Sequence, residues 1–292
     1  MSKTRIEWAD SVWNPVTGCT PVSEGCQNCY AKRMSKRLAG RCGYPKDEPF
    51  KVTLHPDRLE QPLRWKKPRR IFVCSMGDLF HEDVDDGFLC RVFETIAVAE
   101  QHTFMILTKR PERMREFFER CVYGIWDNLL LGVTAENQQR ANERIPILLQ
   151  IPAVRRFVSV EPMLGSVDLV AALDAAIDIE GKVEIPAVDG IDNWLHWVIC
   201  GGETGPRARP LHPDWVRSLR YQCRASGTPF FFKSWGEWKS EFATEGELDE
   251  VLCLVDDGKM RTFSMDRGQF FRVGKKTAGR ILDGREWNEV PK

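Results

Sequence analysis

The sequence has no apolar run that approaches the roughly 18 residues a membrane-spanning helix needs, so we expect no membrane partner. Its N-terminus lacks the apolar segment of a secretory signal, which predicts a cytoplasmic protein. The 10 cysteines among 292 residues are far fewer than the roughly 8–10% of a disulfide scaffold, so their spacing matters more than their number. A P-loop, a Ser/His/Asp or Cys/His arrangement and an internal repeat are also missing, which argues against kinases, hydrolases and solenoids.

The net charge of the chain is zero, but the charges are unevenly distributed. The 42 Lys and Arg residues balance 42 Asp and Glu residues, yet residues 1–70 hold 15 basic and 7 acidic side chains, a net charge of +8. Two basic clusters, at residues 32–41 and 64–70, contribute most of this excess. Because a local basic surface attracts phosphates, we expect a nucleic acid or a nucleotide as substrate or partner. The alternative is a solvated helix face and a charged linker.

Short apolar runs rich in β-branched residues recur along the chain, and most of them lead through a polar turn into a helix-like stretch. This rhythm of βα units predicts a parallel sheet, and the near-continuous apolar runs suit strands covered on both faces. We therefore expect an α/β fold, a partial or complete (βα) barrel of parallel strands, with an open doubly wound sheet as the alternative. The predicted strands lie at residues 12–16, 70–74, 103–107, 128–133, 154–160, 196–200 and 229–233.

The same pattern predicts how the chain is divided. The barrel is expected to occupy residues 1–236, with excursions from the βα rhythm at 36–68 and 178–193. Beyond it, shorter alternating pieces predict a small β-containing C-terminal appendage over 237–292. The alternating pieces are residues 251–255 and 269–273.

The most informative segment is the loop at residues 18–31, which we call the cysteine loop. Cys19, Cys26 and Cys29 form a C-x6-C-x2-C pattern in it, directly after the first predicted strand. Three thiolates on one loop can bind a single metal centre, and C-x2-C pairs occur in zinc and iron–sulfur sites. A closed zinc site needs a fourth ligand, and the nearest candidates, Cys42 and His55, belong to no second ligand pair. The pattern favours a [4Fe–4S] cluster with one open iron over zinc or a metal-free loop.

The segment from Asn14 to Arg33, with its three cysteines, resembles the cluster loop of radical S-adenosylmethionine (SAM) enzymes, especially the spore photoproduct lyase-like branch. Over its whole length, including residues 234–238 and 278–284, the chain resembles an uncharacterised phage-associated family named for its three-Cys motif. The first gap between the cysteines is six residues, where the common radical SAM loop has three. Gly201-Gly202-Glu203 resembles the motif that holds the SAM amino group, but it lies on the sixth predicted strand instead of the second, so its role is not transferred.

The radical SAM resemblance implies both cofactors and a reaction. The three cysteines would ligate a [4Fe–4S] cluster, SAM would bind its open iron, and an electron donor would drive reductive cleavage of SAM and hydrogen abstraction from a substrate. The rival hypothesis is a non-catalytic nucleic-acid-binding protein with a structural zinc or iron–sulfur site.

Polar residues at the C-terminal ends of the predicted strands supply the remaining candidates, because these ends share one mouth of a βα barrel, where active sites lie. Carboxylates there can accept hydrogen bonds from a ribose or an ammonium group, and lysines such as Lys109 and Lys233 can bind a carboxylate or a phosphate. The alternative for each residue is an ion pair within the mouth. The residues predicted to bind the cofactor are Tyr30, Ser75, Asp78, Thr108, Lys109, Glu136, Asn137 and Glu161.

Overall fold

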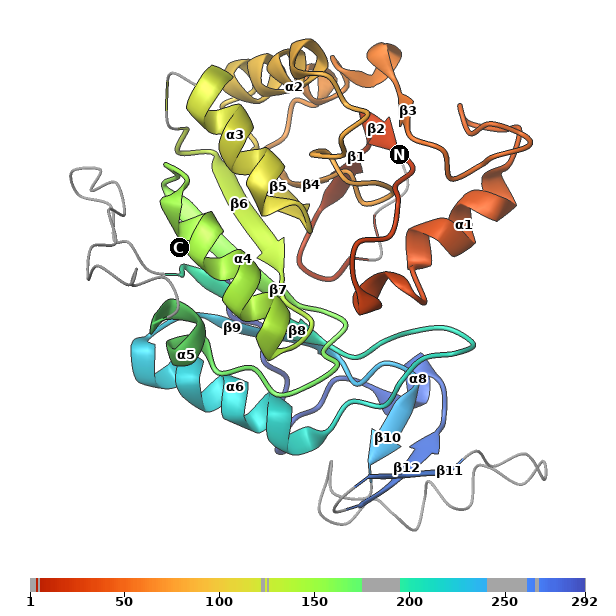
Figure 1. The fold of residues 1–292 in the computed structure, drawn as a ribbon, viewed down its shortest axis with the longest axis vertical. Helices are drawn as coiled ribbons and strands as arrows, with labels where there is room; N and C mark the ends of the chain where they lie inside the picture. Colours follow the sequence, from red (N-terminus) through yellow and green to blue (C-terminus); the bar gives the residue numbers. More distant parts are fainter. Residues whose placement is uncertain are drawn as a thin grey trace.

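A computed structural model describes residues 4, 6–121, 124, 126–174, 195–240, 262–265 and 268–291. Its centre is a curled sheet of seven parallel strands, half of a barrel, in the order β1-β4-β5-β6-β7-β8-β9 (Figure 1). The strands are β1 (Ser11–Trp13), β4 (Arg70–Val73), β5 (Thr103–Thr108), β6 (Leu129–Thr134), β7 (Arg155–Val160), β8 (Trp197–Gly201) and β9 (Phe230–Ser234).

The strand order decides between the two predicted architectures. Each strand of the sheet lies beside the next one in the sequence, with β1 and β9 at the two edges. A doubly wound sheet reverses its strand order near the middle, and this sheet does not. The prediction of an α/β fold with a partial barrel of parallel strands is confirmed, and the doubly wound alternative is wrong.

Helices connect the strands and cover one face of the sheet (Figure 1). Their starts follow local chemistry: the carboxylate of Asp85 accepts a hydrogen bond from the Phe88 N–H at the start of α2, and Pro111 opens α3. In Figure 1, α1 stands apart from the other long helices. The helices are α1 (Tyr30–Leu38), α2 (Asp86–Val98), α3 (Pro111–Cys121), α4 (Gln138–Gln150), α5 (Leu169–Asp174), α6 (Pro213–Ser226) and α8 (Lys275–Ala278).

The face opposite the helices has its own apolar cluster near the beginnings of the strands. The indole of Trp8, from the N-terminal segment, packs edge-on against Phe72 at 4.8 Å and Trp197 at 6.0 Å between ring centroids. Phe157 and Phe231 belong to the same cluster. Since side chains alternate between the faces of a strand, this face is apolar where the strands begin and becomes polar toward their C-terminal ends.

The C-terminal part of the chain forms a three-stranded antiparallel sheet in the order β10-β12-β11. The final segment then runs antiparallel to β9, where Phe231 pairs with Asn288 and the Phe232 N–H donates to the Trp287 carbonyl at 3.0 Å. This segment covers part of the exposed edge of the seven-stranded sheet. The strands of the small sheet are β10 (Trp238–Ser240), β11 (Thr262–Met265) and β12 (Gly268–Arg272).

The structure describes some of the other predicted segments and leaves others outside the described residues. The strand predicted at 269–273 corresponds to β12, whereas residues 178–193 and 251–255 lie outside the described residues. Within the described part of the chain, no helix has the length and apolar character needed to cross a membrane. The excursion at 36–68 contains short elements: β3 (Thr53–Leu54), which pairs with β2 (Val16–Thr17), and the 3-10 turns η2 (Pro56–Arg58) and η3 (Pro62–Arg64).

Candidate active site at the mouth of the half-barrel

The cysteine loop crosses the C-terminal ends of the strands. It starts at Gly18, whose N–H donates to the Met76 carbonyl just beyond β4 at 2.9 Å. Gly18 has φ +85°, and a Cβ there would lie 2.2 Å from the Lys51 carbonyl oxygen, so no other residue fits. The loop contains the 3-10 turn η1 (Glu24–Cys26) and ends where Cys29 precedes α1.

Arg110, just beyond β5, holds the first cysteine. Its guanidinium donates a hydrogen bond to the Cys19 sulfur at 3.3 Å and forms an ion pair with Asp78 at 3.4 Å. Asp78 also accepts hydrogen bonds from the Thr108 hydroxyl at 2.7 Å and from the Lys109 N–H at 3.1 Å. Three predicted site residues therefore meet here, and together they position an arginine that the sequence analysis did not single out.

The surroundings of Cys19 oppose its ionisation. Burial raises the pKa of the Cys19 thiol to about 11, the charge of Asp78 adds to this effect, and Arg110 partly offsets it. The protonated Cys19 thiol donates a hydrogen bond to the Thr20 carbonyl at 3.3 Å. Since a metal binds the thiolate, the hydrogen bond from Arg110 favours the form that ligation requires.

Glu136, at the end of β6, holds the middle of the loop. Its carboxylate is completely buried, accepts a hydrogen bond from the Ser23 hydroxyl at 2.6 Å and pairs with Arg144 at 2.8 Å. Lys109 lies 3.9 Å from the same carboxylate. A Cβ on Gly25 would lie 2.2 Å from a Glu136 oxygen, so the loop approaches this carboxylate closely enough to require glycine.

Glu24 connects the loop to the start of α4. It forms an ion pair with Arg140 at 3.0 Å and accepts a hydrogen bond from the Asn137 side chain. Burial alone would raise the pKa of Glu24, but the hydrogen bonds from Arg140 and Asn137 lower it, so the carboxylate stays charged. The predicted site residue Asn137 thus caps α4 and holds the cysteine loop at once.

Glu203, after β8, holds the segment between the second and third cysteines. One of its oxygens accepts a hydrogen bond from the Asn28 amide at 2.9 Å, and the carboxylate pairs with Arg209 at 2.6 Å. Arg209 also donates to the Glu24 carbonyl at 3.0 Å. A Cβ on Gly202 would lie 2.1 Å from the Trp235 carbonyl, so this glycine allows close backbone packing beside Glu203. The Gly-Gly-Glu motif therefore supports the loop.

Glu161 and Lys233 form a separate ion pair on the face of the sheet opposite the helices. Their side chains are 22% and 19% exposed, and the missing side chain of Gly201 leaves space beside them. Burial alone would lower the pKa of Lys233, but Glu161 raises it, so the amine stays protonated. Among the carboxylates predicted to bind the cofactor, Glu161 has no contact with the cysteine loop in the described residues.

The other candidates lie around this mouth. The Ser75 hydroxyl donates to the Asn14 side chain at 3.2 Å, and Tyr30 is 54% exposed at the start of α1. The basic cluster at 32–41 lies on and just after α1, beside the cysteine loop. The cluster at 64–70 leads into the start of β4, at the opposite end of the sheet.

The donor set of the cysteine loop fits an iron–sulfur cluster. Cys19, Cys26 and Cys29 are reduced and partly buried on one loop that several strand ends support. Among the residues that the structure describes, no three His, Cys, Asp or Glu side chains gather closely enough for one metal ion. Thiolates on a cluster bind different irons and lie farther apart than the ligands of a single ion. Three thiols without a fourth suit a cluster with one open iron.

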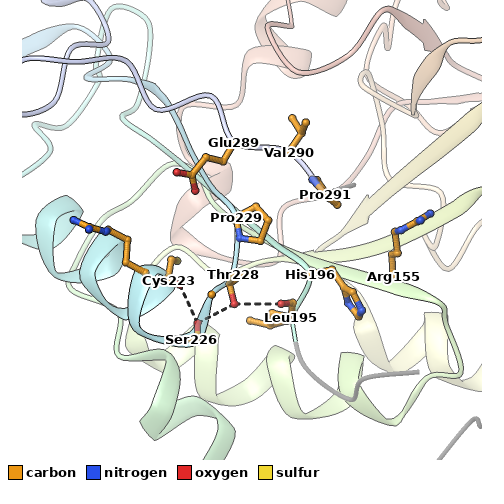
Figure 2. Close-up of a pocket in the computed structure, with 12 residues that line it drawn as sticks. Arg155, Leu195, His196, Cys223, Ser226, Thr228, Pro229, Glu289, Val290 and Pro291 are labelled. Carbon is orange, nitrogen blue, oxygen red and sulfur yellow. Dashed lines mark hydrogen bonds between the residues drawn. The ribbon is translucent and has the colours of Figure 1, made fainter. Parts of the chain in front are cut away.

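A cavity of about 640 Å³ lies at the opposite end of the sheet, where β7, β8 and β9 begin (Figure 2). Arg155, His196 and Pro229 line it, and the Ser226 and Thr228 hydroxyls are 2.9 Å apart at its wall. None of the predicted site residues is among those lining it. Because function in βα folds concentrates at the C-terminal strand ends, we place the candidate site at the cysteine loop.

The chain has low similarity to solved structures of spore photoproduct lyase. A double mutant with bound AdoMet and dinucleoside spore photoproduct is 12% identical with a TM-score of 0.46, covering 92% of this chain and 70% of that one. The lyase complexed with dinucleoside spore photoproduct is 12% identical with a TM-score of 0.42, and a single mutant is 14% identical with a TM-score of 0.44; each covers 90% of this chain and 68% of the other.

Among curated proteins, none matches this sequence. A family model does match nearly the whole chain, from residue 3 to residue 291. The chain therefore belongs to the family described as protein of unknown function DUF5131.

Proposed function

We propose that this protein is a radical SAM-type enzyme whose cysteine loop holds a [4Fe–4S] cluster. The observation that carries the proposal is the placement of Cys19, Cys26 and Cys29 on one loop fixed over the C-terminal ends of a half-barrel. The hydrogen bonds and ion pairs that hold the loop do not require three reduced thiols at this position. When bound, the cluster and SAM supply reductive radical chemistry, for which an external electron donor is required.

The chain's own residues prepare the loop for ligation. Arg110 directs a charged hydrogen bond at the Cys19 sulfur, and Asp78 fixes the orientation of that guanidinium. Partners of this kind behind the direct ligands commonly set metal affinity. In this proposal Asp78 therefore acts on the cluster through Arg110, and Thr108 fixes Asp78 in turn.

Glu161 and Lys233 are the residues we assign to the amino-acid part of SAM. That part carries one ammonium and one carboxylate group, which complement Glu161 and Lys233 respectively. The oxygens of Asp78 and Glu136 are already used by Arg110 and by Ser23 and Arg144, so they are poorly placed to accept further hydrogen bonds. A bound SAM would replace the Glu161–Lys233 ion pair with two charge-complementary contacts.

The test is anaerobic reconstitution of the full chain with iron and sulfide, followed by iron and sulfide analysis. The wild-type protein should bind about four irons per chain, and Cys19→Ala, Cys26→Ala and Cys29→Ala should each lose most of this iron. Cys42→Ala is the matched control, because Cys42 is exposed and outside the loop, and it should keep the wild-type iron content. Stoichiometric zinc with no cluster would contradict the proposal and favour the structural-zinc alternative.

A further inference from the structure

A second cavity, of about 350 Å³, lies between the start of α1 and the segment that follows β8. We call it the basic pocket. Lys32, Arg33 and Lys36 line it from the helix, Arg207 lines it from the other side, and Cys29 also belongs to its lining. Neither Cys19 nor Cys26 lines the pocket, so it lies beside the proposed cluster site. The residues around it include four cations and no carboxylate among those described.

The cations of the basic pocket have no ion-pair partner in the described part of the chain. No carboxylate there lies within 4.0 Å of Lys32, Arg33, Lys36 or Arg207. In the cluster at 64–70, three of the five cations have a partner: Arg64 pairs with Glu60, Arg70 pairs with Asp10 and Arg69 stacks on Trp65. Cations gathered around one cavity without a counter-charge repel one another, and an anion in the cavity relieves this repulsion.

Specific contacts fix the walls of the basic pocket. The Arg33 guanidinium donates to the Thr204 carbonyl at 3.3 Å and lies over the Tyr30 ring, 5.8 Å from its centroid. Gly205 has φ +109°, a backbone conformation that favours glycine, and its missing side chain leaves room for the Arg33 guanidinium. The Asn28 amide donates to the Arg207 carbonyl at 2.8 Å, which holds the opposite wall. The pocket is thus preorganised.

We propose that the basic pocket binds a phosphate group of the substrate. Arginine offers paired donors to phosphate oxygens, and the two lysines add point charges one helical turn apart. The exposed ring of Tyr30 next to Arg33 provides a surface on which a base can stack. The ligand is therefore a nucleotide or a nucleic acid held through its phosphate. This inference builds on the proposed function by naming the substrate class that lies beside Cys29.

The test is fluorescence anisotropy of the full chain with a fluorescein-labelled oligothymidylate at several salt concentrations. Charge reversal of the pocket lysines, Lys32→Glu with Lys36→Glu, should weaken binding at least about tenfold at low salt and reduce the slope of log K against log salt by about 1.4. The matched control is Lys66→Glu with Lys67→Glu, which changes the net charge by the same amount. Lys66 and Lys67 are exposed at the opposite end of the sheet. This control should bind within about twofold of the wild type.

Equal losses in both double variants would overturn the inference, because they would indicate attraction by net charge alone. The inference is also overturned if the wild type binds none of three ligands: the oligonucleotide, thymidine monophosphate and inorganic pyrophosphate. If pocket-dependent binding is found, oligonucleotide affinity above that for the monophosphate identifies a nucleic acid, and equal affinity identifies a nucleotide. Thermal denaturation of each variant checks folding, and Arg207→Ala provides a second, milder change in the pocket.

Binding is measured with and without the reconstituted cluster, so the two proposals can fail separately. If no cluster forms but binding that depends on the basic pocket is found, only the proposed function is contradicted. A normal cluster without pocket-dependent binding would contradict only the phosphate assignment.

Discussion

The guanidinium of Arg110 donates a hydrogen bond to the sulfur of Cys19 at 3.3 Å. Burial raises the pKa of that thiol, and Arg110 is the charged group that opposes the rise. We expect Arg110→Met to weaken cluster retention by about 10–100-fold, the range found for residues that orient metal ligands. Iron content after gel filtration at increasing chelator concentration measures this effect.

A matched control for this change is Arg113→Met, on α3, whose guanidinium pairs with Asp86 and does not touch the cysteine loop. It should retain iron as the wild type does. If both variants retain iron equally, Arg110 has no part in holding the cluster.

Glu203→Gln should destabilise the fold by about 2–4 kcal/mol, because the substitution leaves the Arg209 charge without its buried partner. Urea denaturation monitored by circular dichroism gives the free energy of unfolding. The control is Glu60→Gln, which removes an exposed ion pair to Arg64 and should cost less than about 1 kcal/mol. A loss for Glu203→Gln no larger than that of the control would refute the assignment of Glu203 as a support of the loop.

Glu161→Gln and Lys233→Met should each weaken SAM binding at least about tenfold, since each removes one charged partner, worth about 1.5–3 kcal/mol. Iron content should stay unchanged, because neither side chain forms a hydrogen bond or an ion pair with the cysteine loop in the described residues. Isothermal titration calorimetry with SAM on the reconstituted protein measures the affinity. Wild-type affinity in both variants would place the SAM site elsewhere.

Asp283 provides a prediction for pH dependence away from the site. Burial alone would raise its pKa, but hydrogen bonds and charges from Arg217 and Arg220 lower it below the ordinary 3.8. A carboxyl group with a lowered folded-state pKa adds stability that is complete above the unfolded pKa and disappears as the pH falls through the folded pKa. Asp283→Asn should therefore cost about 1–2 kcal/mol at pH 7, as expected for a partly exposed charged pair.

The difference in free energy of unfolding between the wild type and Asp283→Asn should shrink as the pH falls below about 4. Asparagine suits the test because it tolerates the φ of +50° at this position. Unfolding curves at pH 7 and pH 3 measure the effect, and a difference that stays constant with pH would show that the ion pairs do not cause it.

The fold could be predicted from the sequence because its signal is local. The apolar runs at 103–107 and 196–200 are buried strands, and Asn137 and Pro111 mark the starts of helices. The repeat of βα units predicts a parallel sheet, but a half-barrel and a doubly wound sheet share that repeat. Only the strand order in the structure decides between them.

The functions of the strand-end residues could not be predicted in the same way. Whether Asp78 faces a ligand or Arg110 depends on contacts between residues 32 positions apart, and the bond from Asn28 to Glu203 spans 175 positions. One sequence does not reveal such pairs. The sequence placed Glu203 near the site, but only the hydrogen bond from Asn28 to Glu203 shows that Glu203 supports the cysteine loop.

The central claim is that the cysteine loop carries a cluster with an iron open to SAM. Its most direct test is electron paramagnetic resonance of the reconstituted, dithionite-reduced protein before and after SAM is added. The account predicts the spectrum of a reduced [4Fe–4S] cluster that changes when SAM binds and that disappears in Cys19→Ala. A protein that binds no cluster, or a cluster spectrum that SAM leaves unchanged, would contradict it.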